Sequence, residues 1–422
     1  MAEVFEMESL AGESCVTPFD VHQVRAQFPA LSQTINDKPI AYLDNGASTQ
    51  KPEVVIDAIG DFYRSDYANI HRGVHTLSQR ATDAYEGARR TVADFLGADR
   101  VDEIVFTRGT TESINLVASS FVQPRLKPGD RIVISHMEHH ANIVPWQILA
   151  KKTGADLRII PINDAGEINV EAAVRLLDKR TKFLSLVHVS NALGTVNPVE
   201  PIVGIAHDRG IPTMLDGAQA VAHLPIDIDA LGCDFYAFSS HKLYGPTGIG
   251  VLWGKHKHLS AMQPYQAGGD MIRSVSFAGT TFAPPPARFE AGTPHIAGAV
   301  GLSAALDWFT SLDRTALLAH EEKLLAYITE QFQKHERIRI IGTASAKVAV
   351  TSFVVDGIHP HDLGTILDQH GVAIRAGHHC AQPVMERFGI PATARASIAA
   401  YSTFEEADQL MDALEDAMEM FS

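Results

Sequence analysis

The sequence has few cysteines and no excess of positive charge. Only three cysteines, Cys15, Cys233 and Cys380, are scattered through 422 residues. This content argues against a disulfide framework and favours a reducing compartment, so we expect a cytoplasmic protein. A formal net charge of -15 argues against binding to nucleic acid or to an anionic membrane, because no basic stripe is available to contact phosphates.

Long apolar runs are also missing. No run is long enough to span a bilayer, and the acidic N-terminus lacks the cationic and apolar regions of a secretory signal. What is present is an ordinary globular composition, with 45% hydrophobic and 20% charged residues. A chain of this length can bury a large core, and its size predicts two or more domains.

Short apolar strands alternate with helical patterns along most of the chain. The predicted strands lie at 103–106, 131–135, 157–160, 183–187, 213–215, 235–238 and 247–252. This alternation predicts an α/β fold with a mostly parallel sheet that is covered by helices on both faces.

Changes in pattern and composition predict the domain boundaries. Residues 1–17 have no periodicity and are expected to form a flexible extension, which an N-terminal segment at 18–35 follows. We place a large domain at 36–305 and a smaller C-terminal domain at 306–422. The stretch from about Gln263 to Pro294 is expected to be a long irregular loop, and loops of this length are usually functional or interfacial.

Two polar residues follow neighbouring strands of the predicted sheet. Asp216 ends the strand at 213–215, and Lys242 lies in the turn after the aromatic strand that begins at Phe235. The carboxyl ends of strands are where open α/β sheets collect ligand groups. A lysine that forms a Schiff base and an acid that pairs with a pyridinium nitrogen are the two protein groups that pyridoxal phosphate requires. A lone lysine in a turn is usually only solvated, so the interpretation depends on the pair.

Other polar residues also follow predicted strands, with less specific patterns. Gly109, Thr110 and Thr111 precede a helix and could bind an anion, although Ser and Thr cap most helices. His139 belongs to a group of three histidines that lacks the His-Glu-x-x-His spacing of a zinc site, so stacking on a planar ring fits it better. His71 lies in a polar loop, where a substrate contact and a merely solvated side chain are equally compatible with the pattern.

With these residues in hand, the chain resembles the class V aminotransferase superfamily of fold-type I pyridoxal phosphate enzymes, and within it the group II (SUF-type) cysteine desulfurases. The resemblance covers the chain from about Asp20 onward. Its motifs are Gly109-Thr110-Thr111-Glu112, Glu138-His139-His140-Ala141-Asn142, Asp216-Gly217-Ala218-Gln219, Ser239-Ser240-His241-Lys242, Arg288-Phe289-Glu290-Ala291-Gly292-Thr293-Pro294 and Arg375-Ala376-Gly377-His378-His379-Cys380-Ala381. The sequence departs from the family at Asn45-Gly46-Ala47-Ser48, where relatives often carry Ser-Ala-Ala-Ser.

The resemblance implies a large domain with a mostly parallel seven-stranded sheet, a smaller C-terminal α+β domain and a homodimer with shared sites. Lys242 would anchor the cofactor and act as general base, Asp216 would keep the ring nitrogen protonated, and His139 would stack on the ring. The other cofactor-binding residues implied by the resemblance are Gln219 at the phenolic oxygen, Asn191, and, around the phosphate, Thr110, Thr111, Ser239, His241 and, from a neighbouring subunit, Thr293.

The resemblance also implies the reaction. Cys380 would attack the sulfur of bound cysteine and leave a persulfide on the enzyme and alanine as product, because Arg375 and the neighbouring histidines can favour its thiolate. Arg395, Asn191, Arg375 and His71 would contact the substrate, Arg395 through its forked guanidinium. Cys15 and Cys233 are expected to be inert, and no metal is expected.

The short loop before Cys380 cannot swing far, so the resemblance implies a visiting SufE- or SufU-like sulfur acceptor in iron-sulfur cluster assembly. Selenocysteine lyase, with the same residues and a selenium substrate, stays open as an alternative. A class V aminotransferase for which Cys380 is dispensable and a catalytically silent scaffold are the more distant alternatives.

Overall fold

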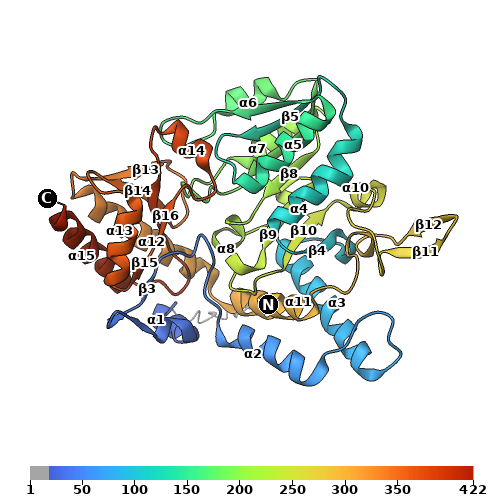
Figure 1. Ribbon diagram of the computed structural model, residues 1–422, viewed down its shortest axis with the longest axis horizontal. Helices are drawn as coiled ribbons and strands as arrows, with labels where there is room; N and C mark the ends of the chain where they lie inside the picture. Colours follow the sequence, from blue (N-terminus) through green and yellow to red (C-terminus); the bar gives the residue numbers. More distant parts are fainter. Residues whose placement is uncertain (1–18, 422) are drawn as a thin grey trace, which may run out of the picture.

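The computed structural model describes residues 19–421 and contains a large and a small domain (Figure 1). The predicted flexible extension at 1–17 lies outside the described residues. Within residues 19–421, no helix combines the length and the apolar character that crossing a membrane requires.

The large domain is built on a seven-stranded sheet, counted over the described residues, as expected. Strand β10 is antiparallel to both of its neighbours, and the other adjacent pairs are parallel. The order across the sheet is β4 (Ile104–Thr107), β10 (Gly250–Gly254), β9 (Phe235–Ser239), β8 (Thr213–Asp216), β7 (Thr181–Val187), β5 (Arg131–Ser135) and β6 (Asp156–Ile160). This arrangement confirms the predicted α/β fold class.

Different helices cover the two faces of the sheet, because successive residues of a strand point to opposite sides. In β4, Ile104 and Phe106 belong to one apolar cluster and Val105 belongs to another. The first cluster includes residues of α3 (Thr76–Leu96), α7 (Val199–Asp208) and α11 (Ile296–Ser311). The second includes residues of α4 (Thr110–Leu116), α5 (Val144–Thr153) and α10 (His256–Ala261). The remaining helices of this domain are α2 (Glu53–Asp61), α6 (Val170–Leu176), α8 (Ala220–His223) and α9 (Ile228–Leu231).

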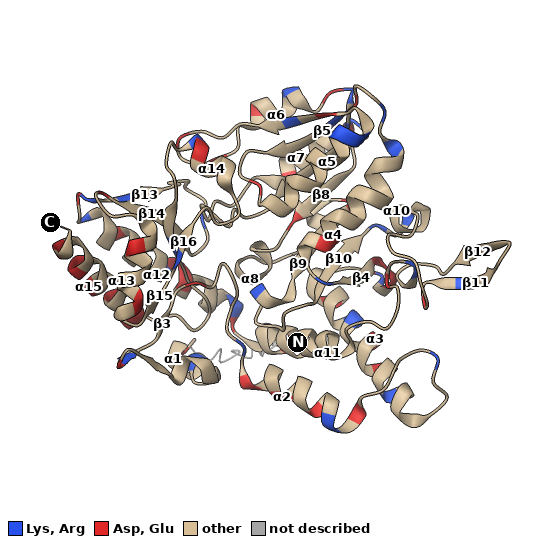
Figure 2. Ribbon diagram, viewed as in Figure 1, with Lys and Arg blue, Asp and Glu red and all other residues tan. Residues whose placement is uncertain are grey.

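The small domain has an antiparallel sheet and a core of its own. The strand order is β13 (Ile338–Ile341), β14 (Val350–Val355), β17 (Thr393–Ser397) and β16 (Arg375–Gly377). Helices α12 (Arg314–Gln333), α13 (Pro360–Gln369) and α15 (Phe404–Met420) pack on it, and α14 (Gln382–Arg387) follows the Cys380 loop. Helix α15 begins with a capping box of Thr403 and Glu406 and carries many acidic side chains (Figure 2).

The boundary that we predicted between residues 305 and 306 falls inside α11. Leu306 and Phe309 pack in the core of the large domain, because α11 continues as one helix to Ser311. Helix α12 is the element that crosses between the domains. Its Leu317 contacts the large-domain core, and its Leu324 belongs to the small-domain core.

An N-terminal strand also belongs to the small domain, although we had placed it in the large one. Strand β3 (Ala41–Tyr42) pairs in parallel with β15 (Val372–Ala373), and Ala41 and Leu43 are buried in the small-domain core. Ahead of it, α1 (Val21–Arg25) contacts the same domain through an ion pair of Arg25 with Glu406 at 2.7 Å. The chain leaves β3 and runs directly into the interdomain region.

A hairpin interrupts the segment that we expected to be irregular. Strands β11 (Ile272–Ser276) and β12 (Gly279–Phe282) pair antiparallel and project from the large domain (Figure 1). Almost every residue of the two strands is exposed, so no buried face imposes the alternation of polar and apolar residues that predicts a strand.

Candidate active site

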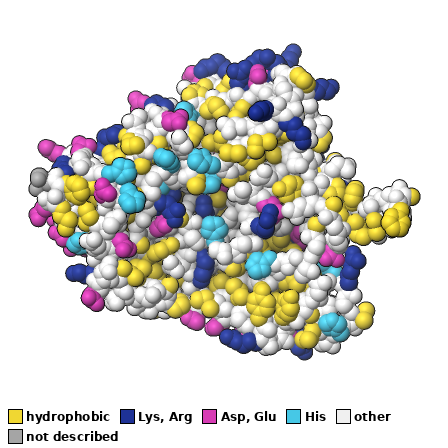
Figure 3. Space-filling model, viewed as in Figure 1, with side chains coloured by type: hydrophobic (Ala, Val, Ile, Leu, Met, Phe, Trp, Pro, Cys, Tyr) yellow, Lys and Arg dark blue, Asp and Glu magenta, His cyan; other side chains and the backbone are white. Residues whose placement is uncertain are grey.

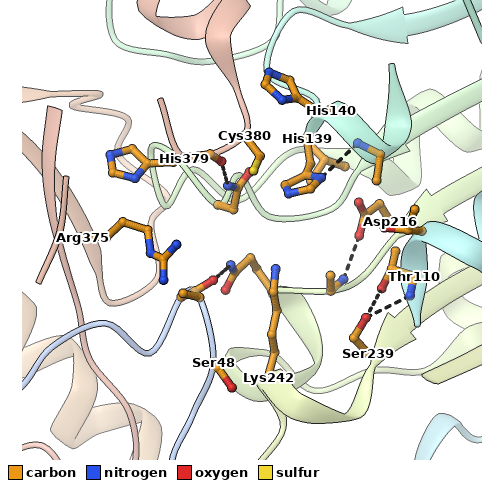
Figure 4. Close-up of a pocket in the computed structure, with 18 of the residues that line it drawn as sticks. Ser48, Thr110, His139, His140, Asp216, Ser239, Lys242, Arg375, His379 and Cys380 are labelled. Carbon is orange, nitrogen blue, oxygen red and sulfur yellow. Dashed lines mark hydrogen bonds between the residues drawn. The ribbon is translucent and has the colours of Figure 1, made fainter. Parts of the chain in front are cut away.

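A cavity of about 630 Å³ lies between the two domains, at the carboxyl ends of β8 and β9. Histidine and basic side chains gather near the middle of this face of the molecule (Figure 3). The cavity brings together most of the site residues that the sequence predicts, namely Thr110, Thr111, His139, Asn191, Asp216, Gln219, Ser239, His241, Lys242, Arg375, Cys380 and Arg395. The sheet edge supplies one wall and the small domain supplies the other (Figure 4).

Lys242 ends a short 3-10 helix, η7 (Ser240–Lys242), directly after β9. Burial lowers the pKa of its amine to about 8, against the opposing attraction of Asp216. The segment after β3 holds this turn, because the His241 carbonyl accepts hydrogen bonds from the Thr49 N–H at 3.0 Å and from Lys51 Nζ at 3.1 Å. These contacts hold the backbone of the turn, and with a pKa of about 8 about a tenth of the amine is neutral at pH 7.

Asp216 is the last residue of β8, which lies beside β9 in the sheet. Its Oδ1 accepts a hydrogen bond from the Ala218 N–H at 2.9 Å, and burial raises its pKa while Lys242 opposes the shift. Because β8 and β9 are parallel neighbours, the acid and the lysine that follow them reach one cavity. This is the juxtaposition that the sequence predicts for a pyridoxal phosphate site.

His139 faces the cavity as a neutral ring. Its Nδ1 accepts the Ala141 N–H at 3.0 Å, so the ring proton belongs on Nε2. Burial, assisted by the positive charge of Lys242, lowers its pKa to about 3. The turn is anchored by Glu138, which accepts from the Val187 N–H at 3.0 Å and from Asn142 Nδ2 at 2.6 Å. The Val187 contact ties the His139 turn to β7, and the Asn142 contact is made within the turn itself.

Hydroxyl groups cluster where β9 ends and α4 begins. Ser239 Oγ accepts the Thr110 N–H at 2.9 Å and lies 2.8 Å from Thr110 Oγ1. The approach of β10 to the turn after β4 requires glycine, since a Cβ at Gly250 would lie 2.5 Å from the Gly109 Cα. Backbone N–H and hydroxyl donors at a helix start are suited to an anion such as a phosphate.

Cys380 lies in a short loop that is clamped to the large domain. Its backbone is left-handed, with φ values of +52° at His379 and +54° at Cys380. Three hydrogen bonds hold this conformation: the His140 N–H to the Cys380 carbonyl at 2.7 Å, Asn191 Nδ2 to the His379 carbonyl at 2.6 Å, and His379 Nε2 with Thr393 Oγ1 at 2.7 Å. The thiol side chain is exposed, so a rigid loop presents it to the solvent at the cavity.

Asn191 and Gln219 line the cavity but already have protein partners. Asn191 Nδ2 is used by the Cys380 loop, while its buried Oδ1 has no partner among the described residues. Gln219 Nε2 donates to the Gly46 carbonyl at 2.7 Å, which leaves its second N–H for another acceptor. Their predicted contacts to the cofactor and substrate therefore stay predictions.

Two of the predicted site residues lie elsewhere in the chain. His71 is bonded to Glu86 at 2.9 Å and lines a separate cavity together with Arg72 and Asp270. Thr293 lines a third cavity. The loop position of His71 in the sequence could not distinguish the main cavity from this neighbouring one. The expected role of Thr293 at the site of a neighbouring subunit stays a prediction.

Asp44 does not line the cavity, but it contacts two arginines that do, and the sequence pattern did not predict this role. It follows β3 and pairs with both Arg375 and Arg395. Its position after a strand is the same signal that pointed to Asp216, but the two arginines that it contacts are more than 300 residues away in the sequence.

The residues of the cavity fit pyridoxal phosphate. The group needs a reactive amine, a buried acid, a flat contact for its ring and donors for its phosphate. Lys242, Asp216, His139 and the Ser239 and Thr110 pair supply these in one cavity. The volume lies within the range typical of small-ligand sites, roughly 300 to 1,000 Å³.

Comparison with known proteins is consistent with this geometry. The sequence matches the family Aminotransferase class-V over residues 41–410. A cysteine desulfurase from Dickeya dadantii is 52% identical over 400 residues, covering 94% of this chain and 97% of the relative. A cysteine desulfurase from Synechococcus elongatus is 51% identical over 396 residues, covering 94% of this chain and 63% of the relative, so the chain spans less than two thirds of that protein.

Solved structures show the same similarity. The crystal structure of an S-sulfonic acid form of a cysteine desulfurase from Escherichia coli superposes with a TM-score of 0.90 at 42% identity, covering 96% of this chain and 100% of that one. The apo structure of a cysteine desulfurase from Thermococcus onnurineus gives a TM-score of 0.88 at 40% identity, with 93% and 98% coverage.

Proposed function

This chain belongs to the class V aminotransferase family, and on that basis we propose that it is a pyridoxal phosphate-dependent cysteine desulfurase that converts L-cysteine to L-alanine. One observation carries the proposal. A buried lysine beside an acid and an exposed cysteine face one another across a single cavity. An aminotransferase has no use for the cysteine, and an inactive scaffold has no use for the lysine and the acid.

Pyridoxal phosphate, when bound, supplies an electrophilic carbonyl carbon and a ring that withdraws electrons from the bound amino acid. Lys242 would anchor it, and the neutral amine of Lys242 would move the Cα proton of the substrate, for which a pKa of about 8 is suitable. Asp216 would stabilise positive charge on the ring nitrogen. His139 provides a neutral flat contact and an Nε2 proton.

Cys380 then takes the sulfur. Its thiolate sulfur forms a bond to the sulfur of the substrate while the Cβ–S bond of the substrate breaks, and the electron pair stays on Cβ. That carbon gains a proton and becomes the methyl group of alanine, so a thiol of the enzyme becomes a persulfide. The positive charges of Arg375 and Arg395 interact electrostatically with Cys380 at this end of the cavity.

Arg395 binds the carboxylate of the substrate in this proposal. It is 1% exposed, and its Nε has no partner among the described residues. A buried guanidinium with unused donors is suited to a carboxylate, which accepts two parallel hydrogen bonds. Arg375 is available for a further contact at the same end of the cavity.

The rigid Cys380 loop supports delivery of sulfur to a visiting protein. Because the loop cannot carry the persulfide away, an acceptor must approach the exposed cysteine, and we propose a SufE- or SufU-like shuttle serving iron-sulfur cluster assembly. A SUF-type group II enzyme, a homodimer with Thr293 reaching the neighbouring site, and a cytoplasmic location stay predictions that accompany this proposal.

Variants of the two walls test the function. Cys380→Ala should retain bound cofactor but release no alanine or sulfide from L-cysteine. Lys242→Ala should lose the covalent link to the cofactor, measured as the fraction retained after borohydride reduction. Cys233→Ala, which changes a buried cysteine away from the cavity, should keep the activity. Undiminished alanine formation by Cys380→Ala would exclude a desulfurase.

A further inference from the structure

Asp44 is the only acidic side chain, among the described residues, that forms ion pairs with Arg375 and Arg395. Its two oxygens accept from Nε and Nη2 of Arg375, at 3.0 Å to Oδ1 and 2.8 Å to Oδ2, in a fork-to-fork pair. Its Oδ1 also accepts from Nη2 of Arg395 at 3.2 Å. One carboxylate thus bridges two guanidinium groups that would otherwise repel one another.

These contacts determine which N–H donors of the two arginines remain unused. Arg395 gives Nη1 to the Asn191 carbonyl at 2.8 Å and Nη2 to Asp44, which leaves its Nε buried and without a partner. Arg375 gives one whole edge of its guanidinium to Asp44. Both arginines line the cavity, and Arg375 lies on the same side as Cys380 and His379 (Figure 4).

The turn that follows Asp44 is shaped around the same arginine. A Cβ at Gly46 would lie 3.0 Å from Cζ and Nη2 of Arg395. The Gly46 N–H is held by Ser397 Oγ at 2.8 Å, and its carbonyl accepts from Gln219. The backbone therefore approaches the guanidinium as closely as a residue without a side chain permits, and the acid and the glycine together limit where Arg395 can lie.

Arg375, Arg395 and Asp44 together carry one net positive charge. Two guanidinium groups and one carboxylate sum to one positive charge, which is the complement of one α-carboxylate. Asp44 also opposes the loss of charge on buried Arg395, whose pKa burial and the neighbouring Arg375 lower to about 10. Without the acid, Arg395 would be an uncompensated buried charge beside a second cation.

We infer that Asp44 is a positioning residue for substrate recognition, which holds Arg375 and Arg395 as a fixed pair so that their free donors bind the α-carboxylate of the amino acid. The inference rests on the proposed function, since it takes the α-carboxylate of cysteine as the ligand. Asparagine cannot replace the acid, because a single amide oxygen lacks the charge and cannot bridge both guanidinium groups while also completing the fork.

Binding of a matched pair of amines to the holoenzyme tests the role. L-Alanine carries the carboxylate and ethylamine is the same molecule without it, and both can be titrated through the change in absorbance of the bound cofactor. Asp44→Asn should weaken L-alanine binding about ten-fold, the loss of one charge-assisted contact, and leave ethylamine binding unchanged. The KM for L-cysteine should rise by a similar factor with little change in kcat.

The control is an ion pair on the surface, between the two domains. Asp164 pairs with Arg387 at 2.7 Å on the surface and outside the cavity, so Asp164→Asn removes an acid–arginine pair without touching the arginines of the cavity and should change neither affinity. Unchanged L-alanine binding by Asp44→Asn would overturn the inference. Equal weakening of both amines, or loss of cofactor, would overturn it in favour of a structural role, and tighter L-alanine binding would mean that Asp44 competes with the substrate.

A further variant separates failure of this inference from failure of the proposed function. Arg395→Lys should weaken L-alanine binding if this arginine binds the carboxylate. If Arg395→Lys leaves the affinity unchanged, the carboxylate assignment of the proposed function fails. If it weakens the affinity while Asp44→Asn does not, only the role of Asp44 is wrong.

Discussion

The two walls of the cavity differ in how they are built. The wall from the large domain carries buried groups at strand ends, Asp216 and Lys242, whose protonation is shifted chiefly by loss of water. The wall from the small domain carries an exposed thiol, Cys380, and guanidinium groups held by Asp44. In the proposed function the first wall retains a cofactor through every cycle, while the second must admit a substrate and release sulfur.

The backbone of each wall is held in place in a different way. On the sheet side, hydrogen bonds of parallel strands fix the backbone, so a side chain needs only to follow its strand. On the other side, the Cys380 loop has left-handed backbone and depends on contacts from both domains. Changes to the sheet wall should therefore affect the chemistry itself, and changes to the loop wall should affect how the thiol is presented.

Removal of the acid on the sheet wall should have the largest effect. Asp216→Ala takes away the buried carboxylate beside Lys242, and alanine formation from L-cysteine should fall at least about 100-fold, as for loss of a preorganised electrostatic contact. Alkylation of Cys380 by iodoacetamide should proceed as before, because the other wall is untouched. Retention of full activity would remove Asp216 from the mechanism.

Loosening the loop wall should have an intermediate effect. Thr393→Val replaces the hydroxyl partner of His379 Nε2 with a methyl group, and the Nδ1 of that buried ring already has no partner among the described residues. An unpaired buried polar group costs about 1–3 kcal/mol, so the rate of alanine formation should fall about ten-fold while cofactor binding stays the same.

Thr365→Val is the matched control for that change. Thr365 is exposed on α13, and its hydroxyl only bonds the His361 carbonyl of the same helix. It should leave the rate unchanged. Equal rates for the two threonine variants would show that the His379 contact does not hold the thiol in place.

The smallest expected effect is a pH dependence that distinguishes Lys242 from a lysine away from the cavity. Its pKa is lowered to about 8, so in cofactor-free protein the neutral fraction of the amine should rise about five-fold between pH 7 and 8 and level off above pH 9. Labelling by a small amine-directed reagent, located by mass, should follow this curve. Lys51 has a similarly lowered pKa but does not line the cavity, so it should label slowly throughout.

Some elements were predictable from neighbouring residues alone, and others depended on contacts that are distant in the sequence. The strands around Asp216 and Lys242 were predictable because apolar runs and the turns after them are encoded by neighbouring residues. The exposed hairpin at Ile272–Phe282 was missed, because no buried face imposes a pattern on it. The boundary between the domains was misplaced, because the helical pattern of α11 does not reveal which core the helix joins.

By itself the sequence determined the α/β alternation, the polar groups at the strand ends and the chemistry that a lysine, an acid and a cysteine can perform. Tertiary structure alone decided that Asp44 bridges two distant arginines, that Asn191 holds the Cys380 loop, and that His71 lies in a separate cavity. The physical reason is the distance along the sequence over which each kind of interaction acts. Strand formation and turn chemistry act over a few residues, whereas the contacts of Asp44 and Asn191 join segments separated by up to several hundred residues and exist only after the chain has folded.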